Sequence, residues 1–260
     1  MANSDFNDGA AYERLMGRWS RLVGEKFLDW LAPQPNLAWA DIGCGNGAFT
    51  EEIIRRCQPA SVLGLDPAEG QIAFARMRPG TELARFETGD AQALPFPTAS
   101  LDMAVMALVI AFIPDPAKAL AEQVRVVKPG GTVATYMWDM PGGGFPGIHL
   151  FQAMQQLALP NPRPPSSALS TREALESIWT SAGLKDVAST KLSITVFFEN
   201  FDDYWTTFTL PAGPQAKHIM ALTDDKKAEM KDILRRILPI AADGRIAFTS
   251  FANAVKGRRP

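Results

Sequence analysis

Trp39-Ala40-Asp41-Ile42-Gly43-Cys44-Gly45-Asn46-Gly47 is the stretch of sequence that decides the fold of this chain. It predicts a buried strand that ends at a glycine-rich turn and continues directly into a helix. Glycine lets the backbone adopt positive φ and lets a ligand approach without a Cβ in the way. The first N–H groups of the following helix point toward whatever lies over the turn. The pattern therefore indicates a loop that binds a nucleotide-type cofactor, with Asp41 just ahead of its first glycine.

The glycine spacing alone leaves the identity of the cofactor open. Gly43, Gly45 and Ala48 also satisfy the G-x-G-x-x-G/A fingerprint of dinucleotide-binding turns. Asp66 ends the next apolar run, Ser61–Asp66, where an acidic residue would bind ribose hydroxyls. A tight strand-to-helix turn without any ligand is the remaining interpretation of the same residues.

Strand and helix patterns alternate through the middle of the chain, which predicts βαβ units and a parallel sheet. Strands are predicted at 37–42, 61–66, 81–87, 102–108 and 132–138, and helices at 48–57, 67–78 and 116–127. An amphipathic helix is expected at 12–31, ahead of the first strand. Beyond the core, the pattern predicts a helix at 171–182, a strand at 187–198, helices between 201 and 239, and a strand at 245–255.

Length, composition and charge narrow the class of protein. A chain of 260 residues with 47% hydrophobic content is expected to bury one large core in a single domain. The formal net charge of −2 gives no electrostatic footprint for a nucleic-acid partner. The basic segment 256–259 is expected to be a short solvated tail.

Cysteine usage and the lack of recognisable targeting signals indicate where in the cell the protein is expected. The two cysteines, Cys44 and Cys57, flank one predicted helix, and so sparse a pair fits a reducing environment better than a disulfide framework. The first residues lack the basic and apolar regions of a signal peptide. No apolar run is long enough to span a membrane. We therefore expect a cytoplasmic protein without membrane insertion.

Five short motifs occur in a fixed order within residues 36–138. They are Asp41-Ile42-Gly43-Cys44-Gly45-Asn46-Gly47, Gly64-Leu65-Asp66-Pro67, Gly89-Asp90-Ala91 followed by Leu94-Pro95-Phe96, Leu101-Asp102-Met103-Ala104-Val105, and Lys128-Pro129-Gly130-Gly131. Together they resemble the class I S-adenosylmethionine-dependent methyltransferases. The resemblance is closest to the type 11 group of small-molecule enzymes, which includes those of ubiquinone and menaquinone biosynthesis.

This resemblance implies an α/β, Rossmann-like class I methyltransferase fold. Such a fold has a mostly parallel seven-stranded sheet with helices on both faces, an antiparallel closing strand and helical lid insertions. The resemblance also implies a single methyltransferase domain over residues 1–260. Within it, 1–35 would form an N-terminal helical lid, 36–138 the cofactor-binding core, and 139–260 the closing strands with helical insertions on the substrate side.

The resemblance further implies S-adenosyl-L-methionine as the cofactor and S-adenosyl-L-homocysteine as the product. Asp66 would bind the ribose diol. Asp90 and the Ala91 amide would contact the adenine edge, and Asp41 the ammonium group of the methionine tail. The full set of expected cofactor contacts is Arg18, Trp19, Asp41, Gly43, Cys44, Gly45, Asn46, Asp66, Pro67, Gln71, Asp90, Ala91, Ala107 and Leu108.

Several of these residues also have a purely structural interpretation. Asp66 suits a helix cap, Asp90 suits a turn, and a solvated helix position suits Gln71 equally well.

The N-terminal helix carries two competing interpretations. In resembling enzymes such a helix covers the cofactor, so Arg18 is expected to pair with the methionine carboxylate, and Tyr12 and Trp19 to close the pocket. The alternative is a surface helix whose core-facing stripe is Leu15, Trp19 and Leu22.

Methyl transfer from a sulfonium is an in-line displacement at carbon with an excellent leaving group. Orientation and desolvation of the nucleophile can therefore supply most of the catalysis, here on a small or medium-sized organic acceptor. Resembling enzymes often carry a histidine after the fourth strand, whereas Ala111 stands at that position in this chain. His149, after the glycine-rich loop 141–147, is the remaining candidate base, although a solvated or capping histidine fits it better. No residues have metal-ligand spacing, so no metal is expected.

Two other functions remain open from the sequence. An NAD(P)-dependent oxidoreductase shares the glycine turn, but it leaves Asp41, Gly89-Asp90-Ala91 and Pro129-Gly130-Gly131 unexplained. A non-catalytic domain that keeps the fold and binds a cofactor or a partner is consistent with the missing histidine. The fold alone does not distinguish among these functions.

Overall fold

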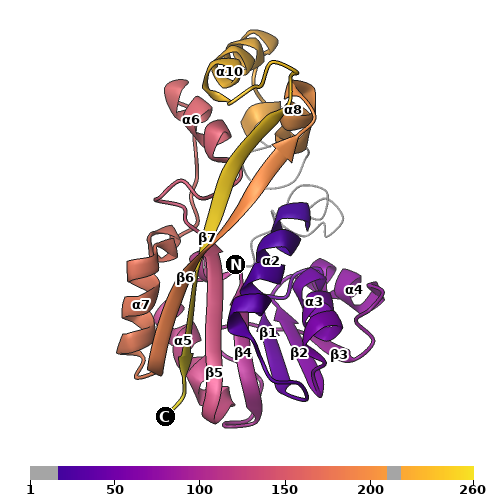
Figure 1. Cartoon of the computed structure of the whole chain (residues 1–260), viewed down its shortest axis with the longest axis vertical. Coiled ribbons are helices and arrows are strands. Elements are labelled where there is room, and N and C mark those ends of the chain that lie inside the picture. The colour runs from indigo at the N-terminus through magenta and orange to yellow at the C-terminus, as the bar shows by residue number, and fades with distance from the viewer. Residues whose placement is uncertain (1–16, 210–217) are drawn as a thin grey trace.

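A seven-stranded sheet organises the computed structural model, which describes residues 17–209 and 218–260 (Figure 1). Its strands are β1 (Ala38–Ile42), β2 (Ser61–Asp66), β3 (Ala84–Thr88), β4 (Leu101–Ala107), β5 (Val127–Trp138), β6 (Lys185–Phe198) and β7 (Ile246–Arg258). Their spatial order is β3-β2-β1-β4-β5-β7-β6, parallel from β3 to β5, with β7 antiparallel to both neighbours. The mostly parallel sheet with an antiparallel closing strand is thus confirmed.

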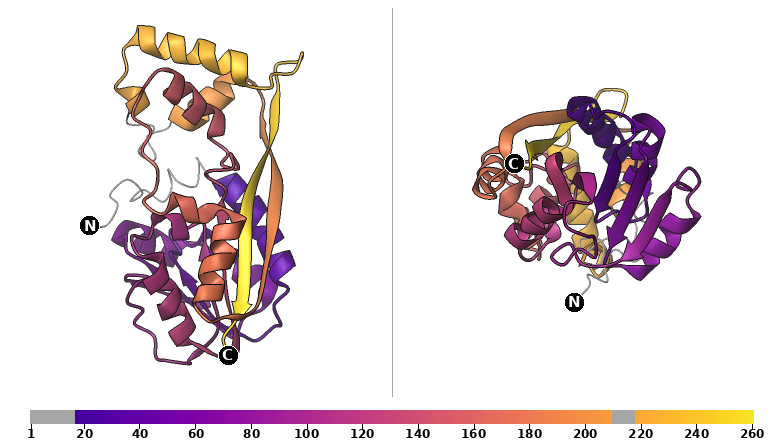
Figure 2. Two further views of the ribbon diagram at one scale, coloured as in Figure 1. Left: turned by 90° about the vertical axis from the view of Figure 1, so that its left-hand side faces the viewer. Right: turned by 90° about the horizontal axis from the view of Figure 1, so that it is seen from below.

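Helices cover both faces of this sheet (Figures 1 and 2). One face carries α2 (Arg18–Leu31), α3 (Ala48–Cys57) and α4 (Glu69–Met77). The other carries α5 (Pro116–Val126) and α7 (Arg172–Ser181). Two 3₁₀ turns, η3 (Ile110–Phe112) and η4 (Ser167–Ser170), lie in the connections that follow β4 and precede α7.

Local signals in the sequence account for the ends of these helices. Asp115 caps α5 by accepting a hydrogen bond from the Lys118 amide at 3.0 Å, and Pro116 occupies the first helical position, where no N–H is needed. In α3, Glu51 lies in the first turn and two arginines lie in the last, so the charges match the helix dipole. These signals explain why both helices begin at the predicted residues.

The last two strands of the sheet continue beyond it as an antiparallel arm. β7 pairs with β5 only from Ala252 onward, so its first six residues pair with β6 alone. The chain leaves the arm at Phe198 and returns at Ile246, and these two residues are partners in the ladder. Between them lie α8 (Phe201–Thr209) and α10 (Asp224–Ile237). Together with α6 (Ile148–Gln156), they form what we call the helical lobe, at the far end of the arm (Figures 1 and 2).

Aromatic packing joins α2 to the arm and to the helical lobe. Trp19 meets Phe198 of the arm edge-on, with ring centroids 5.5 Å apart. It also stacks on Phe208 of α8 at 5.7 Å. Aromatic pairs in these geometries add to the free energy gained by burial alone. The N-terminal helix is therefore anchored to the arm and to α8 as well as to the sheet.

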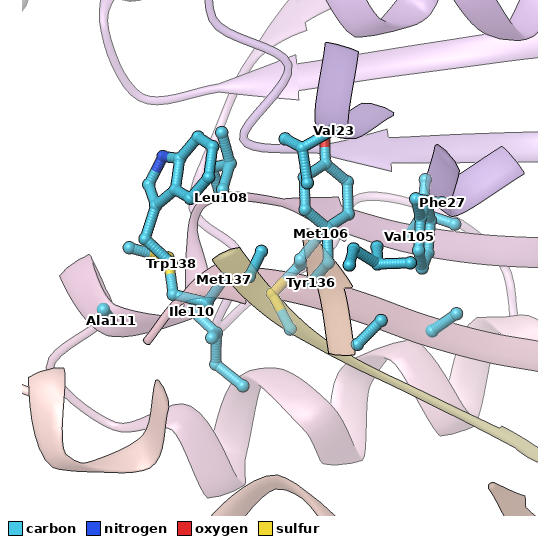
Figure 3. Packing of buried hydrophobic residues seen from close by; sticks show 14 of the residues in the cluster. Val23, Phe27, Val105, Met106, Leu108, Ile110, Ala111, Tyr136, Met137 and Trp138 are labelled. Atoms are coloured by element: carbon cyan, nitrogen blue, oxygen red, sulfur yellow. The ribbon is translucent and has the colours of Figure 1, made fainter. Parts of the chain in front are cut away.

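The central core lies between β4 and β5 and under α2. Figure 3 shows Val105 and Met106 of β4 near Tyr136 and Met137 of β5. The ring of Phe27 on α2 lies 4.6 Å from the ring of Tyr136. Continuous burial along β4 agrees with a strand that is covered on both faces.

Several elements differ from the sequence-based expectation, β5 and α6 among them. β5 begins at Val127 rather than at 132, because Val127 already pairs with Leu101 before the chain passes a turn at Gly130, where φ is +78°. Helix α6 was not expected at all. Its residues follow the glycine-rich loop 141–147, and the glycines there obscured the helical spacing of the buried residues Leu150 and Met154.

The basic segment 256–259 is not the solvated tail that its composition predicts. Lys256 belongs to β7, and its Nζ donates a hydrogen bond to the Trp30 carbonyl at 3.0 Å. Arg259 donates to the Arg125 carbonyl, also at 3.0 Å. Both carbonyls lie in the last turn of a helix, where no intrahelical donor is available. The positive side chains therefore satisfy the carboxyl ends of α2 and α5.

Candidate functional site

A pocket of about 440 Å³ lies at the carboxyl ends of β1, β2 and β4. The strand order reverses between β1 and β4, and ligands of open α/β sheets bind at such a point. The pocket brings together most of the expected cofactor contacts. Those that line it are Gly43, Cys44, Gly45, Asn46, Asp66, Pro67, Gln71, Asp90, Ala91, Ala107 and Leu108.

The glycine-rich turn after β1 forms one wall of the pocket. Gly43, Gly45 and Gly47 all have positive φ, at +75°, +51° and +79°. The Gly43 amide donates to the Leu65 carbonyl at 2.6 Å, which ties the turn to β2. A Cβ on Gly43 would lie only 2.5 Å from Val109 Cγ2. Position 43 therefore requires glycine both for its backbone conformation and for its contact with the segment after β4.

Asp41, at the end of β1, lies behind this turn and does not itself line the pocket. Its carboxylate is fully enclosed. Oδ2 accepts a hydrogen bond from Thr50 Oγ1 at 2.6 Å, while Oδ1 is buried with no partner in the part of the chain that the structure describes. Burial raises the pKa of Asp41 to about 7; the Thr50 hydroxyl opposes this shift and the nearby charge of Asp66 adds to it. An enclosed carboxylate oxygen of this kind is suited to a cationic group.

Asp66 ends β2 and is held by two backbone amides. Gly45 N donates to Oδ2 at 3.0 Å, and Ala68 N donates to Oδ1 at 2.9 Å. Burial raises the pKa of Asp66, and the two amides lower it. The bond from Ala68 forms a turn ahead of α4 (Glu69–Met77), whose N-cap is Ala68 without a side-chain cap, so Asp66 is not the helix cap of the structural interpretation. The carboxylate nevertheless borders the pocket, and each oxygen retains a further acceptor position.

The turn after β3 contributes Asp90, Ala91 and Gln92 to the lining. Asp90 Oδ1 accepts a hydrogen bond from the Gln92 amide at 2.9 Å, so Asp90 does make the turn that its structural interpretation predicts. Because the same residue is exposed at the pocket, the turn and ligand roles are compatible here.

Leu108, just after β4, has an unusual backbone conformation. Its φ is +61°, which is rare for a residue with a branched side chain. The Leu108 amide donates to the Tyr136 carbonyl at 2.9 Å, and the side chain, near Trp138 in Figure 3, lines the pocket. Uncommon backbone conformations of this kind concentrate at ligand-binding positions.

Arg18 and Trp19 do not line this pocket, contrary to expectation. Trp19 is 1% exposed within the aromatic packing against the arm. The Arg18 guanidinium lies 4.7 Å from the centre of the Trp19 ring and 4.9 Å from that of Phe198, in cation–π geometry. Arg18 thus covers the outside of the aromatic packing.

The core-facing stripe of α2 also differs from the alternative that the sequence suggested. Leu22 is 44% exposed, and the buried positions are Trp19, Val23 and Phe27, four residues apart. The proposed partners Tyr12 and Leu15 lie outside the described residues.

Several lining residues were not among the expected cofactor contacts. They include Ser20, Arg21, Phe49, Glu52 and Tyr136. Ser20 and Arg21 come directly after the two expected contacts Arg18 and Trp19. Because a helix turns by about 100° per residue, side chains two positions apart point to different faces of the helix.

An ionic cluster fixes α2 to α3 at this side of the pocket. Arg21 Nε lies 3.1 Å from Glu52 Oε1, and the Glu52 side chain is only 4% exposed. Arg55 also contacts Glu52, and it reaches Glu25 of α2 at 3.3 Å. A buried carboxylate needs such partners, because an uncompensated charge in this position would be costly.

His149 lies on α6 in the helical lobe and does not line the pocket. Its ring packs edge-on against Phe248 of the arm at 4.6 Å, and its Nδ1 is buried without a partner among the described residues. Burial lowers the pKa of His149, which favours the neutral imidazole. Ala111, at the position of the histidine in resembling enzymes, is fully buried, and its carbonyl accepts a hydrogen bond from the Ser166 amide.

The remaining chemistry of the described chain is limited. In residues 17–209 and 218–260, no group of three or more His, Cys, Asp or Glu side chains could hold a metal ion. Both cysteines are buried free thiols, and burial raises the pKa of each. Nor does the described part of the chain contain a helix long and apolar enough to cross a membrane.

Comparisons with known proteins agree with this geometry. Residues 40–135 match the model of a methyltransferase domain family. The malonyl-[acyl-carrier protein] O-methyltransferase of Serratia marcescens is 33% identical over 141 residues, 51% of this chain and 54% of that protein. The demethylmenaquinone methyltransferase of Deinococcus radiodurans is 33% identical over 122 residues, 46% of this chain and 50% of that protein. A putative methyltransferase from Bacillus halodurans is 17% identical, with a TM-score of 0.61 over 91% of this chain and 98% of that one.

Residues 40–135 thus carry a methyltransferase domain, and the chain shares its fold with a solved methyltransferase structure. The matched region contains most of β1, all of β2 to β4 and most of the pocket wall. The chain spans at most about half the length of the curated relatives described above. The helical lobe lies outside the region that the family model covers.

Proposed function

We propose that this protein transfers a methyl group from S-adenosyl-L-methionine to a small or medium-sized organic acceptor. The observation that carries the proposal is a pair of carboxylates at one glycine turn, with Asp66 lining the pocket and Asp41 enclosed behind the turn. A dinucleotide site needs the acid at the end of β2, but it gives no reason for a second, fully enclosed carboxylate at the end of β1.

Each part of the cofactor has a matching group in the described chain. Asp66 can accept hydrogen bonds from the ribose diol. Asp90 and the Ala91 amide suit the adenine edge. Asp41 offers its unpartnered Oδ1 to the ammonium group of the methionine tail, directly or through water. The apolar lining residues Pro67 and Leu108 are suited to the two faces of the adenine.

The chemistry that the bound cofactor supplies is an electrophilic methyl group on a sulfonium. The chain would contribute orientation and exclusion of water, through lining residues such as Val109, Phe112 and Ile113. A base is needed only where the acceptor must lose a proton. We leave the catalytic residue unassigned, with His149 as a candidate that must approach the pocket to act.

The wider assignments follow from the same proposal. We infer one functional unit over residues 1–260, with 1–35 as the lid, 36–138 as the cofactor core and 139–260 as the acceptor side. The net charge of −2 supports a small-molecule acceptor rather than a nucleic acid, and the two free thiols support a cytoplasmic location. The names of the relatives suggest carboxylates and hydroquinones as acceptor classes for a first screen.

Thermal unfolding with four ligands tests the proposal. S-adenosylmethionine, S-adenosylhomocysteine, NAD⁺ and NADP⁺ are each added at about 100 times the expected dissociation constant, where binding stabilises the fold by about 2.7 kcal/mol. We expect a raised melting temperature with the two sulfur compounds alone. The variant Asp66→Asn should lose most of that shift, while Asp225→Asn, at an exposed position on α10, should keep it.

The outcome also separates the competing functions. A shift with a nicotinamide cofactor alone would overturn the proposal in favour of an oxidoreductase. Binding of S-adenosylmethionine without methyl transfer to any acceptor in a mass-spectrometric screen would favour a non-catalytic binding domain.

A further inference from the structure

We propose that the inner face of the arm binds the methyl acceptor, and that this acceptor is an uncharged, elongated molecule with a hydrogen-bonding oxygen at the end that reaches the helical lobe. The inner face is the side of β6 and β7 that carries Ile194, Val196, Phe198, Phe248 and Ser250. The inference rests on the proposed function, because it names the class of molecule that would receive the methyl group.

Strand pairing makes the inner face continuous with the pocket wall. Side chains of directly paired residues, and of alternate residues along one strand, point to the same face of a sheet. Tyr136, which lines the pocket, and Trp138 pair with Ala254 and Ala252 of β7. The same alternation continues along β7 to Phe248. At about 3.4 Å per residue, the face therefore extends for about 20 Å from the level of Tyr136 toward the lobe.

Buried polar atoms without a hydrogen-bond partner recur along this face. His149 packs edge-on against Phe248 at 4.6 Å, and Tyr204 packs edge-on against Phe198 at 4.9 Å, so both side chains lie on the inner face. The atoms that lack a partner in the described parts of the chain are Trp138 Nε1, Ser250 Oγ, His149 Nδ1 and the hydroxyl oxygen of Tyr204. Each such group is costly in the folded state. An acceptor with suitably placed oxygen atoms would remove this cost at several points.

The lobe end of the inner face favours an oxygen atom as its ligand. Tyr204 is fully buried; burial raises the pKa of Tyr204, and the nearby Leu150 amide opposes that rise. Leu150 lies in the first turn of α6, where N–H groups have no carbonyl partner within the helix. Burial lowers the pKa of His149, so its imidazole is neutral. The Tyr204 hydroxyl and the first turn of α6 thus offer uncharged donors to a ligand oxygen.

The strands of the inner face are otherwise apolar on this side. β6 contributes Ile194, Val196 and Phe198, and β7 contributes Ile246 and Phe248. The guanidinium of Arg18 lies over the Phe198 ring, but Arg18 is exposed and covers the outside of the aromatic packing. A charged acceptor on this face would lose its hydration without gaining a counter-charge. An apolar skeleton with isolated oxygen atoms gains from burial and from hydrogen bonds.

Solvent reaches the inner face at its lobe end, and the pocket borders its other end. His149 and Phe248 are half-buried, and Tyr136 lines the pocket. Trp138 and Ser250, which lie between these ends, are buried. An acceptor that spans the face must therefore displace the side chains that cover Trp138 and Ser250.

Binding of three matched probes to the complex with S-adenosylhomocysteine tests the inference. The first, 4-(7-hydroxyheptyl)phenol, carries an oxygen at each end of an apolar skeleton. The second, 4-octylphenol, has a methyl group in place of the distal hydroxyl. The third, 7-(4-hydroxyphenyl)heptanoate, has a carboxylate at that end. By titration calorimetry, we expect the hydroxyl probe to bind more tightly than either of the others.

The variant Tyr204→Phe removes one oxygen and keeps the ring. We expect it to weaken 4-(7-hydroxyheptyl)phenol about 5- to 10-fold, the effect of one neutral hydrogen bond, and to leave 4-octylphenol unchanged. The affinity for S-adenosylhomocysteine should also stay unchanged, because Tyr204 does not line the pocket.

Unfolding of the ligand-free variants separates a binding role from a structural one. Tyr204→Phe and Ser250→Ala each remove a hydroxyl that has no partner among the described residues, so neither should destabilise the fold. Ser193→Ala, at an exposed position on the opposite face of β6, is the matched control for Ser250→Ala and should change neither stability nor probe binding. A clear loss of stability in Tyr204→Phe or Ser250→Ala would give that hydroxyl a structural role and overturn its part in the inference.

Other results would overturn the inference while leaving the proposed function intact. They are failure of all three probes to bind while S-adenosylhomocysteine binds, an equal effect of Tyr204→Phe on the hydroxyl and methyl probes, no effect on either, or tightest binding of the carboxylate. Failure of the unaltered protein to bind S-adenosylhomocysteine would instead overturn the proposed function, and this inference with it.

Discussion

At the scale of single residues, Asp41 shows how a site can oppose the stability of its own fold. The carboxylate is enclosed, one oxygen has no partner among the described residues, and Asp66 adds a second negative charge nearby. The ionised form is therefore unfavourable until a cation arrives. A positive ligand would remove this cost, so part of its binding energy would come from relief of an unfavourable charge.

Asp41→Asn should make stability less dependent on pH. The folded pKa of Asp41 is raised to about 7 from its ordinary value of 3.8, so the unfolded chain ionises first as the pH rises. The unaltered protein should thus lose stability between about pH 4 and pH 7, and the variant should lose less. Melting temperatures across pH 4.5–8 measure this, with Asp225→Asn as the control. Parallel pH profiles for the unaltered protein and Asp41→Asn would contradict the assignment.

Gly43→Ala should damage the fold through two separate effects. The positive φ costs about 1 kcal/mol for a residue with a Cβ, and the contact with Val109 at 2.5 Å adds about 1–3 kcal/mol of overpacking. Gly183→Ala isolates the first effect, because φ is +79° there and no atom lies within 4 Å of the added Cβ. Chemical denaturation measures both variants.

A second variant separates the clash from the strain. Val109→Ala should restore part of the stability of Gly43→Ala, since it removes the methyl groups nearest the added Cβ. If Gly43→Ala and Gly183→Ala cost the same free energy, the close approach to Val109 has no energetic role.

The residues of the glycine turn could be predicted from sequence because their roles are local. Asp41, Gly43 and Asp66 each sit at a strand end, where the element pattern fixes their direction. Arg21 and Glu52 could not be found in that way. Their role depends on how α2 packs against α3, and sequence spacing does not fix the rotation of a helix that has both Trp19 and Leu22 to bury.

At the scale of elements, α2 is the connection between pocket and lobe. Its buried side holds Trp19 against the arm, and the next two residues line the pocket. A change in the packing of Trp19 would therefore shift both the contact of α2 with the arm and the residues of α2 that line the pocket.

Trp19→Ala should destabilise the fold by about 3–5 kcal/mol, the usual cost of truncating a buried aromatic side chain. Leu22→Ala, one turn further along α2 at a position that is 44% exposed, should change stability by less than about 0.5 kcal/mol. Denaturant unfolding of both variants checks the orientation of the helix. Equal losses in the free energy of unfolding would mean that α2 buries Leu22 together with Trp19, as the sequence first suggested.

Element boundaries followed from the sequence where a local signal exists. Pro116 and Asp115 mark the start of α5, and the predicted bounds of α3 and β2 agree with the structure. The true end of β7 escaped because its cause is long-range. Lys256 and Arg259 look like a tail in sequence and become ordered only through carbonyls of α2 and α5.

At the scale of the whole molecule, the cofactor pocket and the helical lobe are built from different elements and lie in different parts of the structure. The pocket is built by the sheet with α2 and α3, and the lobe stands beyond it on the arm (Figure 2). We therefore expect cofactor binding and acceptor binding to respond differently to the loss of the lobe.

Replacement of residues 199–245 by Asn-Gly tests this separation. Phe198 and Ile246 are ladder partners, and a two-residue turn is the shortest connection between such strands. The shortened protein should melt at a lower temperature, because Trp19 loses its stacking on Phe208. It should still bind S-adenosylhomocysteine within about tenfold of the original affinity, a change of about 1.4 kcal/mol. A folded product that binds no cofactor would show that the lobe is part of the cofactor site.

The pairing of Phe198 with Ile246 in the ladder also has a consequence for how such a chain can evolve. A gene segment whose product enters and leaves the sheet at neighbouring residues can be exchanged by recombination without changing the distance that the flanking strands must span. Under the proposed function, such an exchange would change the acceptor preference and leave the residues of the cofactor pocket unaltered.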